Sequence, residues 1–323
     1  MLMEKRRRTV LVLGAGASLP VGFPLGRELA LRASTIDRGM AELLERAGAP
    51  SDQIQEFPNV LRKAAPSSID ALLEHRTEFI PIGKLLIALH LIPYEHPDTL
   101  FSSDHPRSWY NYLYGLIASG PAKDLFKNDQ LSVITFNYDR SLEAALLQKV
   151  QYTHNLSDAD AREVVRRIPI VHVHGSLGPL PGEAEESRAY SNAVTPATLQ
   201  MAAQSITVIH EGAPQEPLEK AHRLLRLASD VVFLGHGFLP ANMQRLGLEQ
   251  NCTNRHVGYQ SMMLQNVGVP DRAQFHGTAI DRTVSERKLG IEPLFERVGG
   301  IRLGRNDEDA LEFLRNHNEL FIG

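Results

Sequence analysis

Short apolar runs without alternation recur along the chain. They span Thr9 to Leu13, Leu131 to Ile134, Ile170 to Val173 and Val231 to Leu234, and Ile206 to Ile209 is another short run. Unbroken apolar runs of this length are typical of strands buried on both faces of a parallel sheet. The pattern therefore predicts that these runs form the strands of one sheet.

Segments with helical periodicity separate the apolar runs, and strand patterns are scarce between about Gly39 and Gly120. The expected helices are Leu25 to Ser34, Met40 to Ala47, Ile69 to Phe79, Ile82 to Leu91, Trp109 to Ala118, Arg140 to Val150, Glu219 to Leu227 and a closing amphipathic helix from about Asp307 to Phe321. Ser67 or Ser68 can cap the helix that begins at Ile69. Alternating strands and helices predict an α/β fold with a doubly wound parallel sheet of Rossmann-like type.

The chain is expected to form one domain over residues 1–323. A helical module of about residues 39–120 is inserted after the first strand and helix, and about residues 121–323 complete the sheet and end in the closing helix. The stretch Gly178 to Thr198 is rich in Pro, Gly, Ser and Glu, which predicts a loop.

Composition narrows the class of protein. Of 323 residues, 43% are hydrophobic and 22% charged, and the net charge of −4 does not indicate direct binding of nucleic acid. The basic run Lys5 to Arg8 is expected to be solvated rather than a contact patch. Cys252 is the only cysteine, so an intrachain disulfide and a cysteine-rich zinc site are excluded. We find no apolar stretch near the length of a membrane span, which predicts a cytoplasmic protein without membrane contact.

A glycine-rich turn follows the first apolar run. Gly14-Ala15-Gly16-Ala17-Ser18 suits a turn that points backbone N–H groups at a phosphate. The dinucleotide fingerprint G-x-G-x-x-G is incomplete because its third glycine is replaced by Leu19, and no acidic residue ends a second strand about 20 residues on. An ordinary dehydrogenase is therefore disfavoured. Nucleotide binding and a purely structural turn both stay open, and the former is favoured.

Polar side chains end two further runs. Asn137 and Asp139 leave the second run two residues apart, although Asp139 could instead cap the next helix. The third run ends in His172-Val173-His174-Gly175-Ser176, where His174 is the better ligand-facing candidate. His172 is expected to face the same side and to be a core histidine. Because parallel strands end at one edge, these groups are expected to converge there.

Two other histidine patterns carry less weight. A zinc site built on His172 and His174 lacks further ligands, so no metal is expected. His276-Gly277 repeats the His-Gly dipeptide without a preceding apolar run, which predicts a loop. The aromatic helix face around Trp109 and Tyr110 is interpreted as core rather than as an interface.

In this order the motifs resemble those of the sirtuin-like superfamily. Gly14 to Ser18 with Gly22-Phe23-Pro24 resembles its first motif, Asn137-Tyr138-Asp139 its second and His174-Gly175-Ser176 its third. Phe233-Leu234-Gly235-His236-Gly237-Phe238 resembles the late motif that lines the adenosine side. The segments Ser68 to Leu73 and Ile82-Gly83-Lys84 resemble the helical insert of bacterial members, and the likeness runs from about Val10 to Leu248.

Two departures point to one branch of that superfamily. Its protein deacylases carry a four-cysteine zinc module after the histidine-glycine pair, where this chain has the cysteine-free stretch Gly178 to Thr198. They usually continue with Phe-Arg after the residue matching Pro24, where this chain has Leu25-Gly26. Both features are similar to the branch that hydrolyses NAD+ in bacterial anti-phage defence.

The resemblance implies that NAD+ is the substrate and is cleaved to nicotinamide and ADP-ribose. Asn137 would orient the ribose hydroxyls and the attacking water, His174 would act as general base, and Asp139 would fix the Asn137 loop. The turn from Gly14 to Ser18 would cradle the pyrophosphate, and Gly235 to Phe238 would hold the adenosine half.

Other interpretations remain open. The same residues could serve NAD-dependent deacylation or ADP-ribosyl transfer, or the pocket could be a non-catalytic NAD or ADP-ribose sensor within a larger complex. The resemblance also implies activity restrained by a trigger, so a homo-oligomer or a separate regulatory protein is the expected partner.

Overall fold

The computed structural model describes residues 7–101, 108–127, 130–208, 216–255 and 268–321. Six parallel strands form one sheet in the order β3-β2-β1-β4-β5-β6. They are β1 (Thr9–Leu13), β2 (Leu131–Thr135), β3 (Ile170–His172), β4 (Asp230–Leu234), β5 (Gln274–Gly277) and β6 (Arg302–Leu303). This sheet confirms the predicted α/β class with a parallel, doubly wound arrangement.

The order of strands reverses beside β1. The chain passes from β1 outward through β2 to β3, and then returns to the other side of β1 with β4, β5 and β6. Ligands of open α/β sheets bind at such a reversal, outside the carboxyl ends of the strands. The sheet therefore creates a binding crevice where β1, β2 and β4 end.

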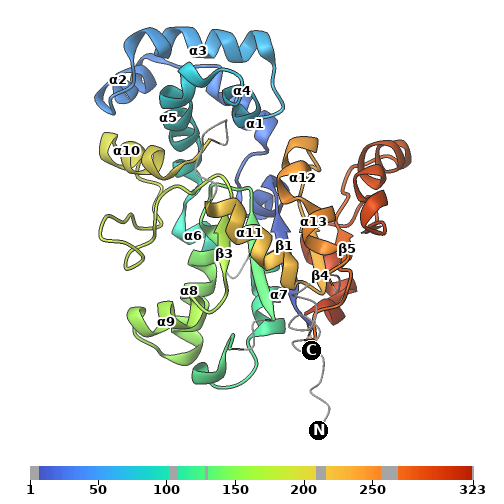
Figure 1. The fold of residues 1–323 in the computed structure, drawn as a ribbon. Helices are drawn as coiled ribbons and strands as arrows, with labels where there is room; N and C mark the ends of the chain where they lie inside the picture. Colours follow the sequence, from blue (N-terminus) through green and yellow to red (C-terminus); the bar gives the residue numbers. More distant parts are fainter. Residues whose placement is uncertain (1–6, 102–107, 128–129, 209–215, 256–267, 322–323) are drawn as a thin grey trace.

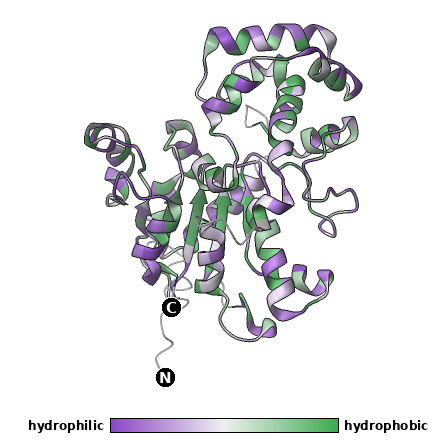
Figure 2. Cartoon of the chain, turned by 180° about the vertical axis from the view of Figure 1, so that it is seen from behind, coloured by the Kyte–Doolittle hydropathy of each residue, from purple (hydrophilic) through white to green (hydrophobic). Residues whose placement is uncertain are grey.

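Both faces of the sheet are covered. Alternate residues of the fully buried strand β1 enter two different cores, Leu11 and Leu13 on one face and Val10 and Val12 on the other. Figure 2 shows the strands as a hydrophobic centre between helices whose outer surfaces are mainly hydrophilic. This two-sided burial explains why the strand sequences show no alternation.

Six helices form a module at one end of the sheet (Figure 1). They are α1 (Gly26–Ala33), α2 (Arg38–Arg46), α3 (Ser51–Ala64), α4 (Ile69–Leu73), α5 (Ile80–Leu91) and α10 (Pro196–Ser205). Ser68 caps α4 by accepting a hydrogen bond from the amide of Ala71, as its sequence suggested. The distant helix α10 packs on α5, so the module is not built from the expected insert alone.

The remaining helices flank the sheet. They are α6 (Pro97–Phe101), α7 (Trp109–Ile117), α8 (Ser141–His154), α9 (Asp158–Val165), α11 (Glu216–Leu227), α12 (Pro240–Leu246), α13 (Leu248–Cys252), the short α15 (Val284–Glu286) and α16 (Ala310–Asn316). Helix α7 packs against α8 and α16 rather than within the helical module. Its Trp109 and Tyr110 are buried, so the interpretation of this face as core is confirmed.

Two strand predictions were wrong. His276 and Gly277 form the end of β5, where His276 is buried and lies 3.3 Å from the Asp230 carboxylate. The strand is too short to show a period, which hid it in the sequence. Ile206 makes only an isolated antiparallel bridge to Gly175, and Ile209 lies outside the described residues.

The expectation about membrane-length segments also needs correction. Within the described part of the chain, the 18 residues Thr77–Tyr94 are long and apolar enough to cross a membrane. The segment comprises three consecutive helices, and more than half of it is buried in the protein. Its central helix α5 packs against α1, α3, α4 and α10, so we interpret it as the core helix of the helical module.

Candidate active site

A cavity of about 490 Å³ lies between the carboxyl ends of the strands and the helical module. Its lining includes most predicted site residues: Gly14, Ala15, Gly16, Ser18, Pro24, Asn137, Asp139, His174, Gly235, His236 and Gly237. The predicted residues absent from this lining are Ala17, Gly22, Gly175, Ser176 and Phe238. The three strand-end motifs therefore meet at one site.

The glycine turn packs backbone against backbone on the turn that follows β4. The amide of Gly14 donates to the Leu234 carbonyl at 3.1 Å, and that of Gly16 donates to the Gly235 carbonyl at 2.9 Å. A Cβ atom on Gly235, whose φ is +58°, would lie 2.0 Å from the amide nitrogen of Ala17. These glycines are thus required for close approach of the two turns.

This packing differs from the free phosphate cradle expected from the sequence. The amides of Gly14 and Gly16 are already paired, and that of Ala17 donates to the Gly14 carbonyl at 2.9 Å. The physical reason is that β4 runs directly beside β1, so its carbonyl groups reach the turn. Three of the expected N–H donors are therefore unavailable to a pyrophosphate in this conformation.

Asn137 is a buried amide held in one orientation. Its Nδ2 donates to the Gly14 carbonyl at 2.9 Å and to Ser18 Oγ at 3.0 Å. Because a carbonyl can only accept, these contacts fix which end of the amide is nitrogen. Asn137 Oδ1 makes no hydrogen bond within the described part of the chain, so this acceptor is left for a ligand at the cavity.

Asp139 reaches Asn137 through a serine. Ser18 Oγ donates to Asp139 Oδ2 at 2.7 Å while accepting from Asn137. The other carboxylate oxygen of Asp139 accepts from the backbone amide of Ser141 at 3.1 Å and from its hydroxyl. Burial raises the pKa of Asp139, and the hydrogen bonds from Ser141 and Ser18 oppose that shift. The carboxylate thus both holds the start of α8 and supports the Asn137 amide.

His174 is buried at the base of the cavity with an unpaired ring nitrogen. Its imidazole packs against Phe136, with ring centroids 5.7 Å apart, and Nδ1 makes no hydrogen bond with any described residue. Burial lowers the pKa of His174, and the nearby Asp70 carboxylate partly opposes this effect. The imidazole is therefore neutral near neutral pH, with Nδ1 buried and without a hydrogen-bond partner among the described residues.

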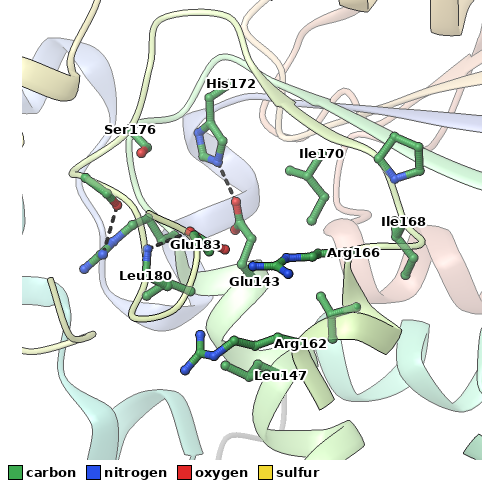
Figure 3. A pocket seen from close by; sticks show the side chains of 14 residues that line it. Glu143, Leu147, Arg162, Arg166, Ile168, Ile170, His172, Ser176, Leu180 and Glu183 are labelled. Atoms are coloured by element: carbon green, nitrogen blue, oxygen red, sulfur yellow. Dashed lines mark hydrogen bonds and ion pairs between the residues drawn. The ribbon is translucent and has the colours of Figure 1, made fainter. Parts of the chain in front are cut away.

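His172 does not share a cavity with His174, so the expectation that the two face the same side was wrong. Strand β3 ends at His172, and the chain turns at Gly175 with φ of +67°. The alternation of side chains applies only within a strand, and it is lost between the two histidines. His172 instead lines a separate cavity with Ser176 (Figure 3).

The predicted residues outside the cavity have structural contacts. Gly175 bridges to Ile206, and a Cβ atom there would lie 2.0 Å from the Ser205 carbonyl oxygen. Phe238 is buried against Phe233 and Phe295. The glycine turn continues directly into a short 3-10 helix, Ala15–Val21, which ends at Gly22. The Ala17 carbonyl accepts from the indole of Trp109 at 2.7 Å.

The helical module contributes residues that the sequence reasoning missed. Asp70 of α4 accepts a hydrogen bond from the Tyr138 hydroxyl and lines the cavity beside His174. Burial raises the pKa of the Asp70 carboxyl, while His174 lowers it. Glu74 and Arg245 also line the cavity, as does Arg27, which is exposed and makes no ion pair with the described residues. The helix start at Ser68 and the resemblance of Ser68 to Leu73 to the helical insert were the sequence signals that could have indicated this wall.

We identified no metal-binding cluster among the residues that the structure describes. Among the described residues, no group of three or more His, Cys, Asp or Glu side chains is arranged to hold an ion. The side chains that line the cavity include an oriented amide, an imidazole, carboxylates and arginines.

A family model for the SIR2-like domain matches residues 131–247. No curated protein matches the chain. Among solved structures, a SIR2 homolog–NAD complex is 14% identical with a TM-score of 0.41, covering 97% of this chain and 90% of that one. A SIR2 in complex with the inhibitor EX-527, 2′-O-acetyl-ADP-ribose and deacetylated p53 peptide is 15% identical with a TM-score of 0.37, covering 97% and 93%. The SIR2-like segment includes Asn137, Asp139 and His174 but not the glycine turn.

Proposed function

We propose that the protein is an NAD+ glycohydrolase that cleaves the bond between nicotinamide and ribose. The observation that carries this proposal is that one cavity is lined both by Asn137, whose amide is fixed and whose Oδ1 is an open acceptor, and by the buried imidazole of His174. The SIR2-like match over both residues, together with the motif resemblance, supports NAD+ as the nucleotide.

The chemistry suits these two groups. Loss of nicotinamide leaves an oxocarbenium-like ribose, as in glycoside hydrolysis, and the departing group is neutral, so no strong acid is needed. Asn137 Oδ1 can accept a hydrogen bond from a ribose hydroxyl or from the attacking water. His174 can take the water proton, directly or through a ribose hydroxyl, because burial keeps the ring neutral.

Arginines compensate for the paired amides of the glycine turn. Arg27, Arg245 and Arg282 all line the cavity. Arg27 has no ionic partner among the described residues, whereas Arg282 lies 3.5 Å from Glu286. We assign Arg27 to the pyrophosphate, with Gly235 to Gly237 on the adenosine side.

The test is NAD+ consumption by the purified protein, with products separated by chromatography. Asn137→Ala and His174→Ala should each lower turnover by about a hundredfold or more while the protein stays folded. The matched control is His222→Gln, which alters a half-buried histidine outside the cavity. Full activity in both site variants would refute the assignment. Acetyl-ADP-ribose formed from an acylated peptide would instead indicate a deacylase. Transfer of labelled ADP-ribose to protein would indicate an ADP-ribosyltransferase, and tight NAD+ binding without turnover would indicate a sensor.

We further propose that NAD+ depletion by this cytoplasmic enzyme serves bacterial anti-phage defence and is restrained by self-association or by a regulatory protein. The motif resemblance supports this role. The test compares cellular NAD+ and phage yield in bacteria that express the wild type or Asn137→Ala. Equal phage yield with both would refute the defence role without touching the hydrolase proposal.

A further inference from the structure

A side chain, not a neighbouring strand, holds the backbone carbonyl of Asn137. His172 Nδ1 lies 2.9 Å from the carbonyl oxygen of Asn137, and Nε2 lies 2.5 Å from Glu143 Oε1. Both partners are acceptors only, so both ring nitrogens must carry a proton for the two bonds to form. The geometry therefore describes an imidazolium ion between a carboxylate and the candidate active-site loop.

Glu143 is the group that pairs with the His172 imidazolium, because the other charged groups nearby have other partners. The other charged groups that face His172 are Asp139 after β2, Arg140 directly before α8, Arg162 on α9, Arg166 directly after α9, and Glu183 in the loop after β3. Arg140 binds Glu95, and Arg162 binds Asp158. Arg166 donates to the Gly182 carbonyl, and Glu183 accepts from the Leu180 amide.

Solvent reaches the pair from a cavity of its own. His172 and Glu143 line a cavity of about 420 Å³, and Figure 3 shows the bond between them on its wall. Burial alone would lower the pKa of His172, but the Glu143 carboxylate and its hydrogen bond raise it above the ordinary value. The ring can thus exchange protons without opening the candidate active site.

We propose that His172, held as an imidazolium by Glu143, is a positioning residue that fixes the Asn137 loop for catalysis. The inference rests on the proposed role of Asn137 in NAD+ hydrolysis. It places a second histidine behind the first, with opposite requirements: His174 acts when neutral, and His172 acts when protonated.

Loss of the proton from His172 has a defined consequence. The remaining proton stays on Nε2, because the Glu143 carboxylate is the stronger acceptor. Nδ1 then presents a lone pair to the Asn137 carbonyl, and the two repel. Turnover by the wild type should therefore fall on the alkaline side as His172 deprotonates.

Glu143→Gln is the decisive variant. The amide of the introduced glutamine can donate to Nε2, which leaves the proton of a neutral ring on Nδ1, facing Asn137. The variant should keep turnover near neutral pH and lose the alkaline fall in kcat that the wild type shows. An identical alkaline limb in both proteins would overturn the proposal.

Two substitutions of His172 separate positioning from packing. An asparagine at this position can place its amide near the former Nδ1 and keep the bond to Asn137, whereas a glutamine can reach only toward Glu143. We expect His172→Asn to stay within about threefold of wild-type kcat/KM and His172→Gln to fall about tenfold to a hundredfold. The matched control is His276→Asn, which removes a buried histidine–carboxylate pair far from the cavity. Equal losses in both His172 variants would contradict positioning.

Nitrogen-15 NMR of labelled histidine tests the charge without any turnover. The His172 ring should show two protonated nitrogens at pH 7.5 in the wild type and one in Glu143→Gln, with the signal assigned by its loss in His172→Asn. A neutral ring in the wild type would overturn the proposal. If NAD+ is not hydrolysed, the proposed function fails. The positioning role is then tested by calorimetry, which measures how NAD+ affinity depends on pH in the wild type and in Glu143→Gln. Equal pH dependence in both proteins would then refute it.

Discussion

Glu74, directly after α4, and Arg245 of α12 form an ion pair, 2.6 Å between Oε1 and Nη2, that joins the helical module to the sheet at the candidate active site. Both side chains are largely shielded, with 20% and 14% of their surfaces exposed, and both line the cavity. The ion pair therefore connects two walls of the cavity, one beside α4 and one on α12, that are far apart in the sequence.

Breaking this pair should loosen the closed cavity. Glu74→Gln removes one charge of an ion pair worth up to about 1 kcal/mol, which corresponds to roughly a fivefold rise in KM for NAD+. We expect kcat to change less, because Asn137 and His174 stay in place. Steady-state kinetics on NAD+ measure both, and Glu249→Gln, which breaks an exposed pair with Arg297, is the matched control. An unchanged KM in Glu74→Gln would show that the pair does not govern access.

Asn137→Asp tests whether the fixed orientation of the amide matters. The aspartate keeps an acceptor toward the cavity but loses the donation to the Gly14 carbonyl and to Ser18. Its second oxygen would face that carbonyl, and the two would repel. We expect turnover to fall by about a hundredfold or more, as with Asn137→Ala, in a chromatographic assay of nicotinamide release. Activity within threefold of wild type would mean that an acceptor alone suffices.

His236 should make the fold sensitive to acid. Its Nδ1 accepts from the Phe238 amide at 3.0 Å, and burial lowers its pKa to about 4. Between about pH 6.5, the pKa of an unfolded histidine, and about pH 4, the unfolded chain binds a proton here that the folded chain does not. The stability of the fold therefore decreases as the pH is lowered through this window. The contribution is about 2 kcal/mol between pH 7 and pH 5. Urea unfolding of His236→Asn, whose side-chain oxygen can still accept from Phe238, should show a correspondingly smaller loss; an equal loss would refute the assignment.

The sequence predicted four of the six strands, β1 to β4, whereas β5 was predicted to be a loop and β6 was not predicted. Unbroken apolar runs predict buried parallel strands, and parallel strands end at one edge, so the meeting of Gly14 with Asn137 follows from local patterns alone. The contact of Asp70 with Tyr138 does not, because it depends on how α4 folds back over the sheet. The helix predicted from Ile69 to Phe79 was too long, because α4 ends at Leu73 and a separate short helix covers Thr77–Phe79. The helical pattern does not show which residues α4 contacts.

Three histidines show where predictions from strand patterns fail. His172 and His174 are two residues apart, but β3 ends at the first of them, so they line different cavities. His276 was hidden for the opposite reason, since β5 is a strand of only four residues that begins with an exposed glutamine. Local pattern predicts long buried elements well and the exact ends of short ones poorly.

The cysteine-free loop after His174 is held by a buried ion triad rather than by a metal module. Glu95 binds Arg140 through two hydrogen bonds of 2.8 and 2.6 Å and also binds Arg188. Arg140 Nη1 donates to the carbonyls of Gly178 and Arg188 at 2.9 and 2.8 Å. The loop that the sequence predicted over Gly178 to Thr198 is irregular only up to Thr195, because α10 begins at Pro196. Arg140 and Arg188 donate to several of the loop carbonyls.

Glu95→Gln should therefore destabilise the whole fold. It leaves two buried guanidinium groups without their carboxylate, and removal of one partner from a buried ion pair costs about 3–5 kcal/mol. Urea unfolding followed by circular dichroism measures the loss, and Glu42→Gln, which breaks an exposed pair with Arg38 on α2, should leave stability unchanged. A loss below about 1 kcal/mol in Glu95→Gln would show that the loop carbonyls alone hold Arg140 and Arg188.

Chelation of metal ions, by contrast, should not lower the stability of the wild type, because the loop is held by charge and hydrogen bonds within the chain.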